Sequence, residues 1–225
     1  MPIITNQRSR LIGGGRRGPA WSRAGGAPAP VAAYQPKGAA SLAASYVNLV
    51  TPGTYNAAPG TAPTWDATGG WTFLRTSSQY LLTGITPAAS RTYSMVVRYS
   101  DANLAVNMVL AGAELNGGAF PAFYTRISGV ANIFVYANGA TANGSAEAAA
   151  GVVGVGGTKA YLNGVDEGVT IGAVAGSIPE IYIGARDFSG VADMFASAKI
   201  QALAIYNVTL TASQVAAVSA AMALL

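Results

Sequence analysis

The sequence contains no cysteine and no histidine. The first absence excludes disulfides, thiol nucleophiles and thiolate metal sites, and the second excludes imidazole bases and the commonest zinc ligands. Charge is also scarce, since Asp, Glu, Lys and Arg make up 10% of the residues, whereas soluble domains usually carry about 25%. With 51% hydrophobic residues, this composition favours a protein whose surface is partly covered by neighbours over a free cytosolic monomer.

Other functional signals are missing as well. No apolar run reaches the roughly 18 residues of a membrane span, and no apolar segment of a secretory signal follows the first residues. The run Gly13-Gly14-Gly15 is not a phosphate loop, because no Gly-Lys-Ser/Thr follows it. We therefore expect a protein made in the cytoplasm, with no membrane contact, no cofactor, no metal site and no enzymatic activity.

Positive charge is concentrated near the N-terminus. Residues 1–40 hold six bases and no acid, whereas residues 41–225 hold the other seven bases and all nine acids, a net charge of −2. The Gly- and Pro-rich run 13–30 buries too little apolar surface to offset the entropy lost when it becomes ordered. The sequence therefore predicts an extended basic arm over 1–40 and a folded domain over 41–225, long enough for a substantial core.

Three roles for this arm remain open. The first is a solvated tail, the second is a nucleic-acid-binding segment, and the third is an arm that reaches across to a neighbouring subunit. Arginines with few interleaved aromatics are a weak signal for nucleic acid, so we do not expect that partner. The third role is favoured, and its candidate contact residues are Arg8, Arg10, Arg16, Arg17, Trp21, Arg23 and Tyr34.

After residue 41 the chain alternates short β-rich runs with turn residues, a pattern typical of an antiparallel sandwich. In the run 92–99 the alternation predicts one core-facing side and one wetter side. Gly156-Gly157, Asn138-Gly139 and Asn163-Gly164 are two-residue hairpin signals. The predicted strands cover 46–50, 71–74, 79–82, 92–100, 106–111, 122–127, 132–137, 149–155, 158–162, 180–184 and 198–206.

One helix is predicted, beginning at Thr211. Thr211 and Gln214 have the spacing of a capping box, in which each side chain satisfies a backbone N–H of the other. Leu210 precedes the cap and can pack on Val215, which shares one helix face with Val218. This pattern indicates packing and carries no chemistry.

Several stretches resemble concanavalin A-like jelly rolls of the laminin-G-like group. The run 195–215, with its Ile205-Tyr206-Asn207 and Leu210-Thr211, is similar to that group's closing strand and terminal helix. Residues 159–165 resemble its Tyr-apolar-Asn-Gly hairpin, 181–184 its next strand, and 71–81 its opening strands. The resemblance covers 41–225 and implies an all-β, two-sheet antiparallel jelly-roll sandwich whose first and last strands are neighbours.

That group includes lectins, glycanases, adhesion modules and virion proteins, so the resemblance implies no single activity. Its glycanases carry a Glu-x-Asp-x-x-Glu strand, and this sequence has none. Its calcium sites use loop acids, for which Asp101 and Asp193 are the first to inspect, although neither matches the group's pattern. Five other acids are scattered, and we expect them to be solvated loop charges: Glu114, Glu147, Asp166, Glu167 and Glu180.

Aromatic residues are the candidates for a sugar-stacking site, with core packing as the alternative. The candidates are Trp65, Trp71, Tyr124 and Tyr136. If such rings are exposed beside amides in one groove, glycan binding is favoured. If they are buried, a structural role is favoured.

The leading hypothesis is a structural virion protein of a bacteriophage, a capsid decoration, cement or head-associated subunit that contacts other virion subunits and forms homo-oligomers. Scarce charge, a basic arm and the missing catalytic residues support it. The alternative is a glycan-binding, lectin-like or receptor-binding module. A third hypothesis, a glycanase, requires two carboxylates about 5 to 10 Å apart in a groove.

Overall fold

The computed structural model describes residues 18–87, 93–115, 118–119, 122–126, 134–137, 140–143, 148–171 and 179–225. Within them the larger sheet has eight strands, and β1 (Ala32–Tyr34) pairs with its strand β19. The order of the other strands is β15 (Val165–Thr170), β14 (Lys159–Leu162), β13 (Gly151–Gly156), β6 (Ser94–Ser100), β19 (Ala198–Tyr206), β4 (Gly70–Phe73) and β3 (Thr64–Asp66).

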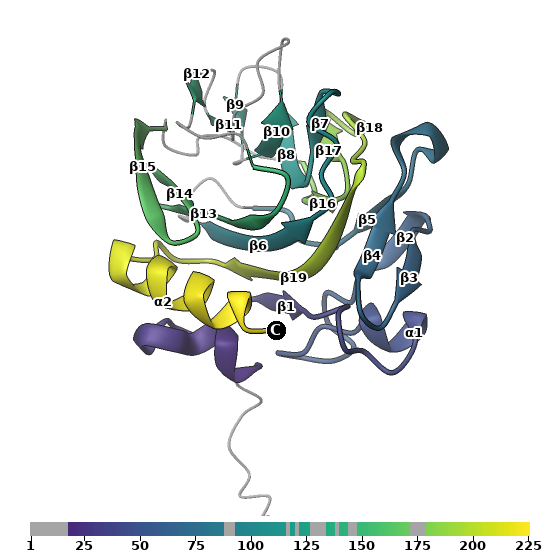
Figure 1. Ribbon diagram of the computed structural model, residues 1–225, viewed down its shortest axis with the longest axis horizontal. Coiled ribbons are helices and arrows are strands. Elements are labelled where there is room, and N and C mark those ends of the chain that lie inside the picture. The colour runs from purple at the N-terminus through teal and green to yellow at the C-terminus, as the bar shows by residue number, and fades with distance from the viewer. Residues whose placement is uncertain are drawn as a thin grey trace, which may run out of the picture.

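The opposing layer is built from two smaller sheets, and Figure 1 shows them stacked over β6, β13 and β19. One has the order β18 (Val191–Asp193), β17 (Arg186–Phe188), β8 (Ala111–Leu115), β16 (Tyr182–Ile183), β5 (Tyr80–Leu82) and β2 (Ala58–Thr61), with β9 (Gly118–Ala119) on β8. The other has the order β12 (Ala140–Asn143), β11 (Phe134–Ala137), β10 (Ala122–Arg126) and β7 (Met108–Val109). In the described part of the chain, four short helices accompany the sheets: η1 (Ala20–Gly26), α1 (Leu42–Ser45), η2 (Arg75–Ser77) and α2 (Ala212–Ala223).

This architecture confirms the predicted sandwich with a short C-terminal helix. It departs from the predicted pair of antiparallel sheets in two ways: one layer is divided between two sheets, and β17 pairs with β8 in parallel. The first and last described strands, β1 and β19, are neighbours, with Ala32 opposite Ile205, although β1 precedes the range 41–225 that the resemblance covers. Between the layers lies one large core whose largest fully buried members include Trp71, Phe73 and Tyr99. Among the described helices, none is long and apolar enough to span a bilayer.

The alternation in β6 is confirmed on its inner side, where Met95 and Val97 are fully buried in the main core. The expectation of a wetter outer side is wrong, because α2 packs against it and Val96 is also fully buried. Helix α2 approaches closely because β13 presents glycines there. A Cβ built on Gly154 would lie 2.9 Å from Cγ1 of Val215.

The capping box of α2 is confirmed in both directions. The amide of Gln214 donates to Oγ1 of Thr211 at 3.3 Å, and the amide of Thr211 donates to Oε1 of Gln214 at 3.0 Å. Val215 and Val218 are fully buried beneath the helix, as the spacing predicts. The start of this helix therefore follows from local chemistry alone.

The hairpin predictions have three outcomes. Asn163-Gly164 is confirmed, because both residues have the positive φ of a tight turn, 51° and 80°. The turn placed at Gly156-Gly157 lies one residue later, because Gly156 still pairs with Lys159. Asn138-Gly139 lies outside the described residues. In addition, the predicted strand 46–50 is a loop.

The predicted boundary of the arm is wrong for residues 18–40, which belong to the folded domain. Figure 1 shows η1 lying against α2 on the side of the helix away from the sheets. Trp21 is 7% exposed and Tyr34 is fully buried, so both anchor this segment on the chain's own sandwich. Sequence alone could not distinguish this docking from docking on a neighbour. Arg23 lies in η1, while Arg8, Arg10, Arg16 and Arg17 lie outside the described residues.

Candidate functional site

Most of the predicted sugar-stacking rings do not offer a free face. Trp71 and Tyr124 are fully buried, and Nε1 of Trp71 donates to Oγ of Ser45 at 2.7 Å inside the core. Trp65 is half-buried, and its Nε1 donates to the carbonyl oxygen of Pro36 at 2.8 Å. Tyr136 lies on β11, and its side chain is outside the described part of the structure. The described aromatic candidates therefore serve mainly in packing.

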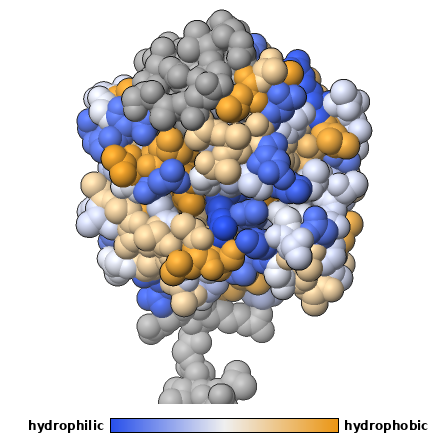
Figure 2. Space-filling model, in the orientation of Figure 1, coloured by the Kyte–Doolittle hydropathy of each residue, from blue (hydrophilic) through white to orange (hydrophobic). Residues whose placement is uncertain are grey.

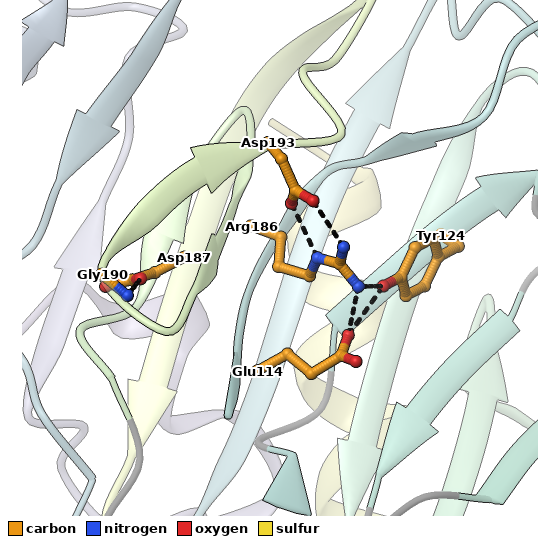
Figure 3. A network of polar contacts seen from close by, with 6 residues as sticks. All are labelled: Glu114, Tyr124, Arg186, Asp187, Gly190 and Asp193. Atoms are coloured by element: carbon orange, nitrogen blue, oxygen red, sulfur yellow. Dashed lines mark hydrogen bonds and ion pairs between the residues drawn. The ribbon is translucent and has the colours of Figure 1, made fainter. Parts of the chain in front are cut away.

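Arg186 is the centre of a polar cluster that joins four strands (Figure 3). Its Nε and Nη2 donate to the two carboxylate oxygens of Asp193 at 2.7 and 2.5 Å. Its Nη1 donates to the Tyr124 hydroxyl at 2.8 Å and to Oε2 of Glu114. Glu114 is only 8% exposed, so the expectation that it is a solvated loop charge is wrong.

The two carboxylates of this cluster share one guanidinium, which balances half of their formal charge. The guanidinium also lies over the ring of Phe188, 4.6 Å from its centre. Burial raises the pKa of the Tyr124 hydroxyl, which stays protonated and can donate to Glu114 at 3.1 Å. Because these groups satisfy one another, the cluster works as a clamp between β8, β10, β17 and β18.

The two loop acids considered for calcium are both engaged in ion pairs. Asp193 pairs with Arg186, and Asp101 pairs with Lys199 at 2.8 Å. In the described ranges no three His, Cys, Asp or Glu side chains come together as metal ligands would. The geometry of these residues gives no support to a calcium site.

A polar hollow of about 320 Å³ lies beside the C-terminal end of α2, where Figure 2 shows hydrophilic residues gathered near the middle of the face. Its polar side chains hold the fold together. Nη1 of Arg98 donates to the carbonyl oxygens of Met222 and Leu225 at 2.6 and 2.8 Å. Oδ1 of Asn163 accepts from the amide of Val152 at 2.9 Å. The hollow is therefore explained by helix capping and turn formation.

A second depression, of about 340 Å³, has a different character, and we call it the Tyr55 groove. Tyr55 is 41% exposed and is the aromatic residue among those that line the groove. The other lining residues are apolar or polar without charge: Ala29, Pro30, Val31, Val50, Thr51, Thr54 and Asn207. Exposed aromatic, hydroxyl and amide groups thus meet in one place.

Backbone strain helps to present the Tyr55 ring. Tyr55 has φ of 55°, in the left-handed region that bulky residues seldom adopt. Its carbonyl oxygen accepts a 2.5 Å hydrogen bond from the buried Tyr34 hydroxyl. Next to it, Oδ1 of Asn56 accepts from the amides of Asn48 and Gly53 at 2.9 and 3.0 Å. These bonds fix the loop in a conformation that leaves the ring partly exposed.

Asn48 ties together the two walls of the Tyr55 groove. It is fully buried, and its Oδ1 accepts from the amides of Ala33 and Val50 at 3.1 and 3.0 Å. Its Nδ2 donates to the carbonyl oxygens of Val31 and Thr54 at 3.1 and 2.9 Å. Both wall segments are thus hydrogen-bonded to the Asn48 side chain, whose two donor and two acceptor positions are all used.

Sequence reasoning missed the residues of this groove. Asn207 was noted in the Ile-Tyr-Asn motif but not as a ligand-binding residue, and Tyr55 was not a candidate. The available signal was the Pro52-Gly53 turn, because turn loops often carry exposed functional side chains. That signal does not indicate which distant segments form the opposite wall.

No known family model matches this sequence, and no curated protein is significantly similar to it. Solved structures do match. One is domain 4 of AbnA, a GH43 extracellular arabinanase from Geobacillus stearothermophilus, in complex with arabinotriose. It has 16% identity and a TM-score of 0.55 over 84% of this chain and 98% of that one. The fold is a concanavalin A-like sandwich.

A second match is a mutant sialidase of Trypanosoma rangeli that displays trans-sialidase activity. It has 15% identity and a TM-score of 0.51 over 88% of this chain. The alignment covers 34% of the sialidase, so this sandwich spans about a third of that protein's length. At such identities the similarity concerns the fold and not the activity.

Proposed function

We propose that this protein is a carbohydrate-binding module that holds a saccharide against Tyr55. The observation that carries the proposal is the partly exposed ring of Tyr55 in a groove with Thr51, Thr54 and Asn207. Small-molecule sites combine apolar and aromatic surface with a few polar groups that set orientation. The arabinanase domain with bound arabinotriose, which has the same fold over 84% of this chain, supports the proposal.

Binding here involves no bond breaking. No carboxylate is among the residues that line the groove, whereas a glycanase requires two acids flanking the sugar. Glu114 and Asp193 come close to the same guanidinium, but that cluster lies outside the groove. The geometry therefore favours a binding module over a glycanase.

The test is an oligosaccharide array, arabinotriose included, followed by titration of the best ligand. Tyr55→Ala is expected to weaken binding about tenfold or more, because the stacking surface is lost. Leu74→Ala is the matched control, since Leu74 is similarly exposed at 46% and lies outside the groove. If no saccharide binds, or if Tyr55→Ala binds as the unaltered protein does, the proposal is wrong.

The second candidate is a subunit of a larger assembly, such as a bacteriophage virion, in which copies of this chain contact one another. Val165 on edge strand β15 and Val191 on edge strand β18 are 67% and 66% exposed. Apolar side chains on strands at a sheet edge favour contact with another chain. Light scattering tests this role: a stable oligomer is expected, and a 22.6 kDa monomer at all concentrations contradicts it.

A further inference from the structure

We infer that the Tyr55 groove selects short, uncharged saccharides over acidic ones. This inference rests on the proposed function and names its ligand class. Two features of the described residues carry it: those that line the groove bear no formal charge, and the side chains of Thr51, Thr54 and Asn207 make no hydrogen bond to one another or to other described residues.

The free hydrogen-bonding groups belong to Thr51, Thr54 and Asn207. Within the described ranges, none of these side chains donates to or accepts from another residue. In the hollow beside α2, by contrast, the side chains of Arg98 and Asn163 already form hydrogen bonds with backbone groups. Threonine hydroxyls both donate and accept, and an asparagine amide does the same through two atoms. Sugar hydroxyls, which also donate and accept, are matched partners for such groups.

The rest of the groove is apolar. Pro30 and Val50 are buried, and Val31 is half-buried, so they form a firm wall beside the exposed ring. The carbon-bound hydrogens of a sugar ring suit such a surface. A carboxylate placed there would lose water without gaining a cation from the described lining, which contains no Lys or Arg.

The size and rigidity of the Tyr55 groove restrict the range of possible ligands further. At about 340 Å³ the groove lies at the small end of ligand sites, which span about 300 to 1,000 Å³. It therefore accommodates a short segment of a glycan. The bonds of Asn48 to both walls mean that little ordering is needed on binding.

The experiment compares matched trisaccharides by calorimetric titration of the full chain. Cellotriose, maltotriose and α-1,4-galactotriose are each paired with the counterpart whose C6 alcohols are oxidised to carboxylates. For any pair that binds, the neutral member is expected to bind about tenfold or more tightly. Equal or tighter binding of the acidic member overturns the selectivity and leaves the binding function intact. If these sugars and the array all fail to bind at any concentration, the proposed function itself fails.

A variant with an added positive charge tests whether the uncharged lining causes the preference for neutral saccharides. Thr54→Lys places a cation in the groove and keeps the backbone carbonyl that Asn48 bonds. It is expected to shift the affinity ratio toward the acidic trisaccharide by about threefold or more. Leu74→Lys adds the same charge outside the groove and is expected to leave the ratio unchanged. If both lysines shift the ratio equally, the lining charge is not what selects the ligand.

Discussion

At the residue scale, Asn48 has the largest organising role in the candidate site. It is a buried polar side chain with four backbone partners, two on each segment that it joins. Buried polar groups stabilise a fold when all their partners are present and destabilise it when partners are lost. The shape of the Tyr55 groove therefore depends on one amide.

Asn48→Ala is expected to lower the free energy of unfolding by about 3 kcal/mol or more, because buried backbone groups lose their partner. Urea denaturation measures this change. Asn103→Ala is the control: Asn103 is exposed and its Oδ1 accepts only the nearby amide of Ala105 among the described residues, so about 0.5 kcal/mol or less is expected. Equal losses in the two variants would contradict the role given to Asn48.

At the element scale, α2 is seated on a surface of small residues. Gly154 and Gly156 on β13 face Val215 and Leu210, and Gly25 of η1 faces Ala217. A Cβ at Gly25 would lie 2.5 Å from the Cβ of Ala217. Helix α2 is thus held between η1 and the larger sheet by close approach at these glycines, together with a cluster of buried side chains that includes Trp21, Tyr206 and Met222.

Gly154→Ala is expected to destabilise the protein by about 1 to 3 kcal/mol, because its new methyl overlaps Val215. A double-mutant cycle with Val215→Ala identifies the cause. The double variant is expected to be more stable than the sum of the two single losses predicts, since the smaller residue removes the overlap. Additive losses, measured by urea denaturation, would show that α2 docking does not depend on this contact.

At the scale of the whole molecule, the segment 18–40 closes the fold. Strand β1 pairs with β19, and the Tyr206 hydroxyl donates to the carbonyl oxygen of Ser22 at 2.7 Å. This segment also supplies Pro30 and Val31 to the groove. It is therefore part of the domain and not a separable arm.

Two truncated chains test whether residues 18–40 are needed for folding and residues 1–17 are not. Removal of residues 1–17 is expected to leave cooperative thermal unfolding essentially unchanged, because the buried anchors Trp21 and Tyr34 remain in the chain. Removal of residues 1–40 is expected to abolish cooperative unfolding, because Tyr34 and Trp21 leave the cores they fill. Circular dichroism measures both. A stable 41–225 fragment would restore the boundary predicted from the sequence.

Buried tyrosines set the response of the whole molecule to alkali. Burial raises the pKa of Tyr99 and of Tyr206 above that of an exposed tyrosine. The pKa of Tyr182 is raised to about 12, and burial is the largest cause. Above about pH 10 the unfolded chain releases protons that the folded chain keeps. Stability is therefore present in full below pH 10 and is lost as pH rises toward the folded pKa values.

Urea denaturation between pH 8 and pH 11.5 measures this loss as a fall in the unfolding free energy above about pH 10. Tyr99→Phe removes one raised pKa and is expected to make the fall shallower, although it also loses the bond to the Ala148 carbonyl. A profile that stays flat up to pH 11.5 in the unaltered protein would show that these hydroxyls ionise as freely when folded.

Features with local causes could be predicted from the amino-acid sequence. Strand β19 spans the predicted 198–206, the Asn163-Gly164 turn has the required positive φ, and α2 begins at its capping box. Alternation, turn chemistry and capping act between residues a few positions apart, so a linear pattern contains them. The sandwich was predictable for the same reason.

Only the tertiary structure decided the candidate site. The walls of the Tyr55 groove come from residues 29–31, 50–55 and Asn207, and Glu114 meets Arg186 across 72 positions of sequence. It also decided that Trp71 and Tyr124 are buried while Tyr55 is exposed. Which distant segments meet depends on how the layers pack and on which polar groups find partners, and neither leaves a periodic trace in the sequence.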